Sequence, residues 1–438
     1  MKLNVKGKEF NFNTPTKITN DAHNLLNRLV ATHLLWEDTF YTNGVDSYKA
    51  LKEVIPQCEP GYVAYQAYHA RHIHGLRHAP MVLLREMARL PKFKNLVGTL
   101  IPEILTRADM LSEFLVLYWN DNQGKKTISA QVKYGLAKAF QNFNEYQLAK
   151  YNNKDAAVKL RDVLFLVHAK PKDQEQENLW KKLITGTLET PNTWEVKISG
   201  SGNTKENWSQ LLIDRALGEL AFLRNLRNME KVGISKAVLK EYGDTLNWKK
   251  VFPYQFIQAA KNVPSLEDIL EPWFLYNCKE RRKLPGKTVI VIDTSGSMQW
   301  PIANKSDTFR VDAAAAIACQ LREICEEVSI YTFTTQAREC APRHGFALRD
   351  SISNAPSGGT VLGASLKQIH NKEKTYDRIV VITDEQTYDS IPNPLNQNGV
   401  IINVSNDLKQ INNDKWLRIN GFSNAMIDYY SMLQLGEI

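Results

Sequence analysis

One stretch decides the fold of this chain: Val289-Ile290-Val291-Ile292-Asp293-Thr294-Ser295-Gly296-Ser297-Met298. Its four leading apolar residues are typical of a strand buried on both faces of a parallel sheet. A carboxylate ends the predicted strand, and two hydroxyls follow it at alternate positions. Hard oxygen donors gathered in one loop suit a small hard cation such as Mg²⁺.

Two more oxygen donors follow along the chain. Thr360 closes the glycine turn Ser357-Gly358-Gly359-Thr360, and Asp384 ends the apolar run 378–384. In a doubly wound α/β sheet, ligands bind at the carboxyl ends of the strands. We therefore expect one metal site, whose ligands are Asp293, Ser295, Ser297, Thr360 and Asp384.

Three other interpretations of the first motif are weaker. A phosphatase of the haloacid-dehalogenase type requires a second aspartate where Ser295 stands. A P-loop requires a lysine after its glycines, and Gly296-Ser297-Met298 contains none. In the third interpretation the two serines merely cap the following helix.

The rest of residues 286–438 alternates strand and helix signals, which predicts an α/β doubly wound domain. We expect strands at 287–293, 328–334, 378–383 and 399–404, and helices at 311–327, 363–370 and 423–433.

The order Asp-x-Ser-x-Ser, Thr, Asp resembles the metal-ion-dependent adhesion site of von Willebrand factor A domains. The resemblance implies that residues 286–438 form such a domain. It also implies a site that binds rather than catalyses, in which a carboxylate of a protein ligand fills the metal's open coordination position.

Composition limits the class of protein. A chain of 438 residues with 43% hydrophobic content is long enough for two or three domains with cores of their own. Its five cysteines form no Cys-x-x-Cys pair and predict free thiols in a reducing compartment. The sequence has no signal-peptide pattern and no apolar run of about 18 residues. We expect a soluble, cytoplasmic protein without membrane contact.

Charge is distributed unevenly between the two parts. Residues 1–285 contain 41 Lys and Arg against 30 Asp and Glu, whereas residues 286–438 contain 14 against 17. A basic first part indicates a polyanionic partner, and ordinary surface charge is the equally weighted alternative.

The first part, residues 20–283, shows helical periodicity with short breaks and almost no strand signal. Many short amphipathic helices in series predict an α-solenoid, although no strict repeat is visible. Two polar stretches, Pro171–Asn178 and Thr190–Asn207, are expected to be loops. The expected helices are 22–32, 62–71, 79–90, 101–106, 111–118, 130–140, 156–166, 208–228 and 235–242.

The densest polar cluster lies between Tyr62 and Arg89, where arginines, tyrosines and four histidines are interleaved. This mixture favours RNA, because guanidinium groups contact phosphates and aromatic rings stack on unpaired bases. A zinc site is less favoured because a predicted helix break at Gly75 separates the histidines. A solvated helix face is the structural alternative. The histidines are His69, His72, His74 and His78.

Several segments of the first part resemble TROVE modules. They are Leu34–Tyr41, Gly75–Pro80 with Leu83–Arg89, Phe143–Asn152, Arg161–Asp162 with His168–Pro171, and Lys283–Lys287. A TROVE module followed by a von Willebrand factor A domain is the arrangement of the Ro autoantigen family and its bacterial and phage relatives. The resemblance spans residues 20–435, but the long insertions of larger relatives are absent here.

The resemblance implies a TROVE domain at residues 1–285, built as a ring of HEAT-like helices that the second domain closes. The ring takes single-stranded 3′ ends of misfolded RNA, and its outer surface binds Y RNA. Motif matching suggests Lys150, His168 and Lys170 for the Y-RNA contacts, with Lys159 and Arg161 as neighbours. Candidates facing the hole are Arg71, His72, Arg77 and His78.

Together these features predict an RNA-binding ribonucleoprotein scaffold in RNA quality control or decay, which is not an enzyme and is monomeric. The resemblance adds an exoribonuclease as a partner. A protein-interaction scaffold that ignores RNA is the alternative from another class. A metal-dependent hydrolase is disfavoured, because the nearest candidate base, Glu385, is expected to face outward.

Overall fold

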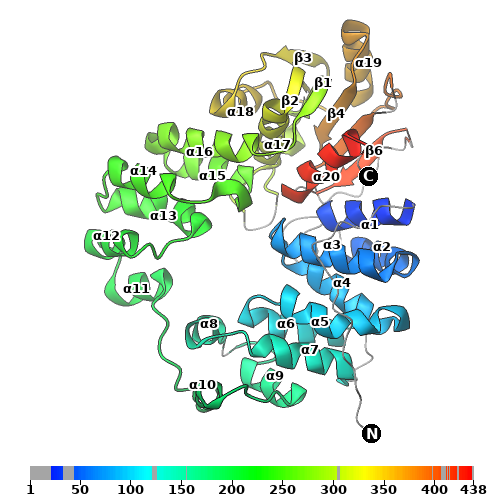
Figure 1. Cartoon of the computed structure of the whole chain (residues 1–438). Coiled ribbons are helices and arrows are strands. Elements are labelled where there is room, and N and C mark those ends of the chain that lie inside the picture. The colour runs from blue at the N-terminus through cyan, green and yellow to red at the C-terminus, as the bar shows by residue number, and fades with distance from the viewer. Residues whose placement is uncertain are drawn as a thin grey trace. The chain divides into compact units, whose positions relative to one another are not determined.

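A computed structural model gives the structure of the chain (Figure 1). It forms two compact units, each described here by itself: unit 1 comprises residues 1–30 and 49–200, and unit 2 comprises residues 31–48 and 201–438. The predicted motif Leu34–Tyr41 lies outside the described residues. Those residues are 21–32, 44–120, 126–153, 155–302, 306–396, 398–405, 411, 413, 415–421 and 424–436.

Unit 1 is helical throughout its described part. Successive helices pack on one another, α3 on α4, α4 on α5 and α5 on α7. Local signals fix several helix starts: Pro60 opens α3, and the side chains of Asn144 and Gln147 cap α8 reciprocally. The helices are α1 (Asp21–Thr32), α2 (Gly44–Val54), α3 (Pro60–His72), α4 (His78–Arg89), α5 (Lys94–Ile104), α6 (Ala108–Trp119), α7 (Ala130–Phe140), α8 (Glu145–Tyr151), α9 (Leu160–Val167), α10 (Gln174–Thr185) and α11 (Trp194–Ser201).

Unit 2 continues the helical series and then changes to an α/β domain. Its helices before the sheet are α12 (Lys205–Ile213), α13 (Glu219–Lys231), α14 (Lys236–Asp244), α15 (Pro253–Asn262) and α16 (Glu267–Lys279). Those within the α/β domain are α17 (Arg310–Ile324), α18 (Gly345–Ser353), α19 (Leu362–Glu373) and α20 (Asn424–Gln434).

The sheet of unit 2 has the strand order β3-β2-β1-β4-β5-β6, and only the edge strand β3 runs antiparallel to its neighbour. Alternate residues of the central strand face opposite sides. Val289 and Val291 pack in one core with Leu362 of α19, and the residues between them are also buried. The strands are β1 (Leu284–Asp293), β2 (Cys325–Phe333), β3 (Ala337–Cys340), β4 (Arg378–Thr383), β5 (Gly399–Asn403) and β6 (Leu417–Asn420).

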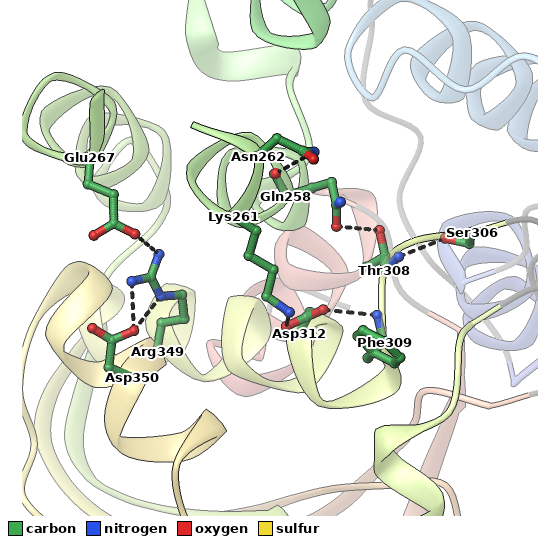
Figure 2. Close-up of polar contacts among 10 residues, drawn as sticks. All are labelled: Gln258, Lys261, Asn262, Glu267, Ser306, Thr308, Phe309, Asp312, Arg349 and Asp350. Atoms are coloured by element: carbon green, nitrogen blue, oxygen red, sulfur yellow. Dashed lines mark hydrogen bonds and ion pairs between the residues drawn. The ribbon is translucent and has the colours of Figure 1, made fainter. Parts of the chain in front are cut away.

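Helix α15 packs on α17, and α16 packs on both α17 and α18 (Figures 1 and 2). Lys261 of α15 contacts the buried Asp312 of α17, and Arg349 of α18 contacts Glu267 at 2.8 Å (Figure 2). Residues on both sides of position 285 thus share one compact unit. The predicted boundary between 285 and 286 stays a prediction.

The fold class is confirmed: helices in series precede a mixed α/β sheet domain. The closure of a ring stays a prediction. The two stretches expected to be loops were wrong in part, because Pro171–Asn178 contains the start of α10 and Thr190–Asn207 contains α11. The single helix expected at 208–228 is in fact two helices, α12 and α13. The chain leaves the helical conformation between them, and Gly218, the N-cap residue of α13, is extended.

All five cysteines are buried and free, which confirms the expectation of unpaired thiols. Burial raises the pKa of each thiol, to about 11 at Cys58. Within the described ranges, no helix has both the length and the apolar character that crossing a bilayer demands.

Candidate functional site

The predicted metal ligands gather at the carboxyl end of the sheet. Asp293 is the last residue of β1, and Asp384 directly follows β4. These strands are parallel neighbours with Ile292 opposite Ile382, so the two aspartates leave the sheet side by side. Both carboxylates are fully buried. The sequence placed them correctly because each ends an apolar strand.

Asp293 is held by two short hydrogen bonds. Its Oδ1 accepts from the backbone N of Ser295 at 2.8 Å, and its Oδ2 accepts from Thr383 Oγ1 at 2.6 Å. Burial, with repulsion from Asp384, raises the pKa of Asp293 to about 7. Burial and the neighbouring carboxylate of Asp384 therefore both disfavour the charged form of Asp293.

The hydroxyl donors lie on two loops that are tied together. Ser295 Oγ and Ser297 Oγ lie 3.3 Å apart. The backbone N of Gly296 donates to the carbonyl of Gly358 at 2.9 Å, which joins this loop to the glycine turn that ends at the buried Thr360. The structure thus brings the loops of all five predicted ligands to one strand end.

Sequence reasoning missed Arg310, the first residue of α17. Its Nη1 donates to Asp384 Oδ2 at 2.7 Å, and both side chains are buried. The same guanidinium lies 5.6 Å from the ring centre of Trp300, which is 58% exposed. One cation already neutralises one of the two carboxylates. An arginine opening the helix after the motif is the only signal the sequence offers.

The expectation for Glu385 was wrong, because this side chain is buried rather than outward-facing. It forms an ion pair with Arg418 and accepts from the backbone N of Ile411 at 3.1 Å. Its backbone is left-handed, with φ +60°.

The donors fit a hard divalent cation in kind, because two carboxylates and three hydroxyls are oxygen ligands. The described residues contain no cluster of three His, Cys, Asp or Glu side chains that could hold a metal. A metal here would depend on the hydroxyls, and it would meet Arg310 at Asp384.

The RNA candidates of α3 and α4 are engaged in packing contacts. Arg71 donates from Nε to Thr106 Oγ1 at 2.9 Å, and His72 Nε2 lies 2.8 Å from the carbonyl of Glu103. Arg77 forms ion pairs with the carboxylates of α6, including Asp109 at 2.7 Å. These contacts tie neighbouring helices together.

His78 carries no charge near neutral pH. Burial and the neighbouring Arg77 lower the pKa of its imidazole to about 4. A neutral, half-buried ring contributes little to phosphate binding.

The candidates of α8 and α9 are placed differently. Lys150, His168 and Lys170 are exposed, and across the parts of the chain that the structure describes none of them is paired with a carboxylate. Arg161 is exposed too, with Asp162 at 3.8 Å, and the half-buried Lys159 lies just before α9.

Lys150 stands at the end of α8. Its Nζ lies over the rings of Tyr146 and Tyr151, at 5.7 and 5.8 Å from their centres. It also borders a cavity of about 270 Å³ between α6, α8 and α9.

Two domain-family models match the chain. The TROVE domain matches residues 185–303, and the Ro60 vWA domain matches residues 287–397. The first covers the end of the helical series, and the second covers the predicted metal ligands. No curated protein matches the sequence.

Among solved structures, this chain is similar to the crystal structure of the Deinococcus radiodurans Ro (RSR) protein. The TM-score is 0.66 at 17% sequence identity, and the match covers 95% of this chain and 100% of that one. At this identity the likeness concerns the fold.

Proposed function

Because this chain is a Ro-like protein, joining a TROVE domain to a Ro60-type von Willebrand factor A domain, we propose that it is an RNA-binding ribonucleoprotein scaffold. Its ligands are single-stranded 3′ ends of misfolded or structured non-coding RNA, and Y-like RNA on the outer surface of the TROVE domain. It acts in RNA quality control or decay, with an exoribonuclease as a partner.

The α8–α9 cations, Lys150, Arg161 and Lys170, carry this proposal, together with the exposed His168 that lies close to them in sequence. They are exposed, and Lys150, His168 and Lys170 are not paired with acids among the described residues. Such side chains exchange solvent counterions for phosphates, so binding depends strongly on salt. On single strands the logarithm of the binding constant falls by roughly 0.7 per phosphate for each tenfold rise in salt.

Scaffolding rather than catalysis is supported by the state of Glu385. A general base must reach a substrate proton, whereas Glu385 is buried and paired with Arg418.

A divalent cation, most simply Mg²⁺, would be held by Asp293, Ser295, Ser297, Thr360 and Asp384. When bound, it would supply an open coordination position for a carboxylate of a protein ligand. Arg310 holds Asp384 in place and competes with that cation for its negative charge.

A second function, protein recruitment at this strand end, is favoured by two exposed aromatic side chains on the same loops. Trp300 is 58% exposed and follows the Ser297 loop, and Tyr388 is 86% exposed and follows Asp384. Exposed aromatic residues are enriched at protein interfaces. This function predicts partner binding that requires Mg²⁺ and tolerates salt.

A gel-shift comparison at several salt concentrations tests the main proposal. One RNA is a hairpin with a single-stranded 3′ tail, and the other is the same hairpin cut blunt. We expect tighter binding of the tailed RNA, with a steep loss of affinity in salt. The variant Lys150→Glu/Lys170→Glu should lose affinity for both RNAs by about tenfold or more, because two phosphate contacts become repulsive.

Lys181→Glu is the matched control for the single reversal Lys150→Glu, because each of these variants changes the net charge by two. Lys181 is exposed on α10 and paired with Glu177 at 2.8 Å, so reversing it should change RNA affinity little. Equal losses in both variants would show that only net charge matters. Weak, salt-insensitive binding of both RNAs by the unaltered protein would contradict the proposal.

A further inference from the structure

Unit 2 contains a polar cavity of about 550 Å³ between α13 and α15, outside the predicted metal site and the α8–α9 cations. Residues 306–308, which precede α17, form its third side. Thr308 Oγ1 donates to Gln258 Oε1 of α15 at 3.3 Å and fixes this segment against the helix (Figure 2). The volume lies in the range of small-ligand sites and far exceeds the need of an inorganic ion.

Two arginines of α13 border the cavity. Arg224 and Arg227 are three residues apart, which places both on one face of the helix. Both are exposed, and neither has an ion pair or hydrogen bond from its side chain to any residue that the structure describes. Some arginines of unit 2 are paired instead, such as Arg281 with Asp428 at 2.7 Å. Two unpaired guanidinium groups facing one cavity are suited to phosphate oxygens.

The neutral lining offers both donors and acceptors. The amide nitrogen of Asn228 donates to Asn225, and that of Asn262 donates to a backbone carbonyl of α15. The side-chain oxygen of each asparagine is left to accept a hydrogen bond from a ligand. Gln255 accepts from the backbone N of Phe252 and keeps its amide nitrogen. Donors and acceptors together are what the edge of an unpaired base requires.

An aromatic ring and a single carboxylate complete the lining. Tyr254 borders the cavity and stacks nearly parallel on Phe252, at 5.9 Å between ring centres and 14° between planes. A tyrosine face supports stacking of any base. Asp307 is the one acidic side chain of the lining, so the cavity keeps a net positive charge.

We propose that this cavity binds one or two nucleotides of single-stranded RNA. The two arginines hold the phosphodiester, the amides of α13 and α15 contact the base edge, and Tyr254 offers a stacking surface. This inference rests on the proposed RNA binding. It adds a binding site for the single-stranded part of the RNA, because Arg71 and Arg77 already contact other protein groups.

The test compares the intact protein with Arg224→Gln/Arg227→Gln. The probes are a short fluorescein-labelled oligouridylate, the tailed hairpin and the blunt hairpin. We expect the variant to bind the oligouridylate about tenfold or more weakly. The slope of the logarithm of the binding constant against the logarithm of the salt concentration should be shallower by roughly 1.4. Two phosphate contacts are lost, and each contributes about 0.7 to the slope. Binding of the blunt hairpin should be unchanged.

Arg338→Gln/Arg343→Gln is the matched control. Both residues are exposed in the same unit, on or after β3, and neither side chain is paired within the described part of the chain. The control should bind all three RNAs like the intact protein. If both double variants lose oligouridylate binding equally, only net charge matters and the cavity is not the site.

A second measurement needs no variant. A 4-thiouridine oligonucleotide crosslinked to the intact protein should label peptides of α13 and α15, whereas labelling confined to unit 1 would overturn the inference. Binding of the blunt hairpin without the oligouridylate would overturn the cavity assignment and leave only the proposed binding of Y-like RNA standing. Absence of binding to every RNA would overturn both.

Discussion

Replacing Lys261 by methionine should lower the free energy of unfolding of unit 2 by about 2 kcal/mol. The Asp312 side chain is 1% exposed, and its carboxylate contacts Lys261 Nζ and the backbone N of Phe309, the latter at 2.9 Å. The variant leaves a buried carboxylate with one donor. Removing one partner of a fully buried pair costs about 3–5 kcal/mol. Because 37% of the lysine side chain is exposed, water screens the pair and we reduce this figure to about 2 kcal/mol.

Urea denaturation followed by circular dichroism measures the effect, and a double-mutant cycle with Asp312→Asn isolates the pair. For a unit of this size, the loss corresponds to roughly 4–8 °C in Tm. Lys240→Met is the control, because Lys240 and Asp244 form an exposed pair one helical turn apart and should contribute less than about 0.5 kcal/mol. Equal destabilisation by the two variants would refute the reasoning from burial.

Three further variants have defined outcomes. Arg310→Gln frees Asp384 from its ion pair, so affinity for Mn²⁺ or Mg²⁺ in titration calorimetry should rise about tenfold, or about 1.4 kcal/mol; unchanged affinity would exclude competition. Gly243→Ala would place a Cβ 2.1 Å from the ring of Trp273, and such overpacking should cost about 1–3 kcal/mol in thermal unfolding. The pKa of His78 is lowered to about 4 in the folded protein. As the pH falls, the His78 imidazole is therefore protonated in the unfolded chain before it is protonated in the folded one. Stability should therefore fall as pH drops from about 6.5 to about 4, and His78→Gln should flatten that slope in a pH series of denaturation curves.

The sheet was predictable where strands are long and apolar. The run before Asp293 and the run before Asp384 each identify a buried strand and the side chain that leaves it, because both signals are local in sequence. The four-residue strands β3 and β6 escaped prediction, since a segment so short lacks a detectable period.

The pairing of charges was not predictable. Arg77 resembles a phosphate ligand by composition, yet its partners Asp109 and Glu113 arrive from another helix 32 and 36 residues later. Arg310 meets Asp384 across 74 residues. Such distant pairs decide which cationic side chains form ion pairs within the protein and which remain available to bind a ligand. The sequence alone does not show these pairs.

The buried cysteines make the two units separately observable. Cys58 is the only cysteine of unit 1, whereas Cys278, Cys319, Cys325 and Cys340 all belong to unit 2. An alkylating reagent reacts with an accessible thiolate. Burial shields the sulfur from the reagent and keeps the thiol protonated. Labelling of each thiol in the native protein therefore measures how often its own unit opens. Mass spectrometry of a timed labelling reaction would compare the opening of the two units without any substitution.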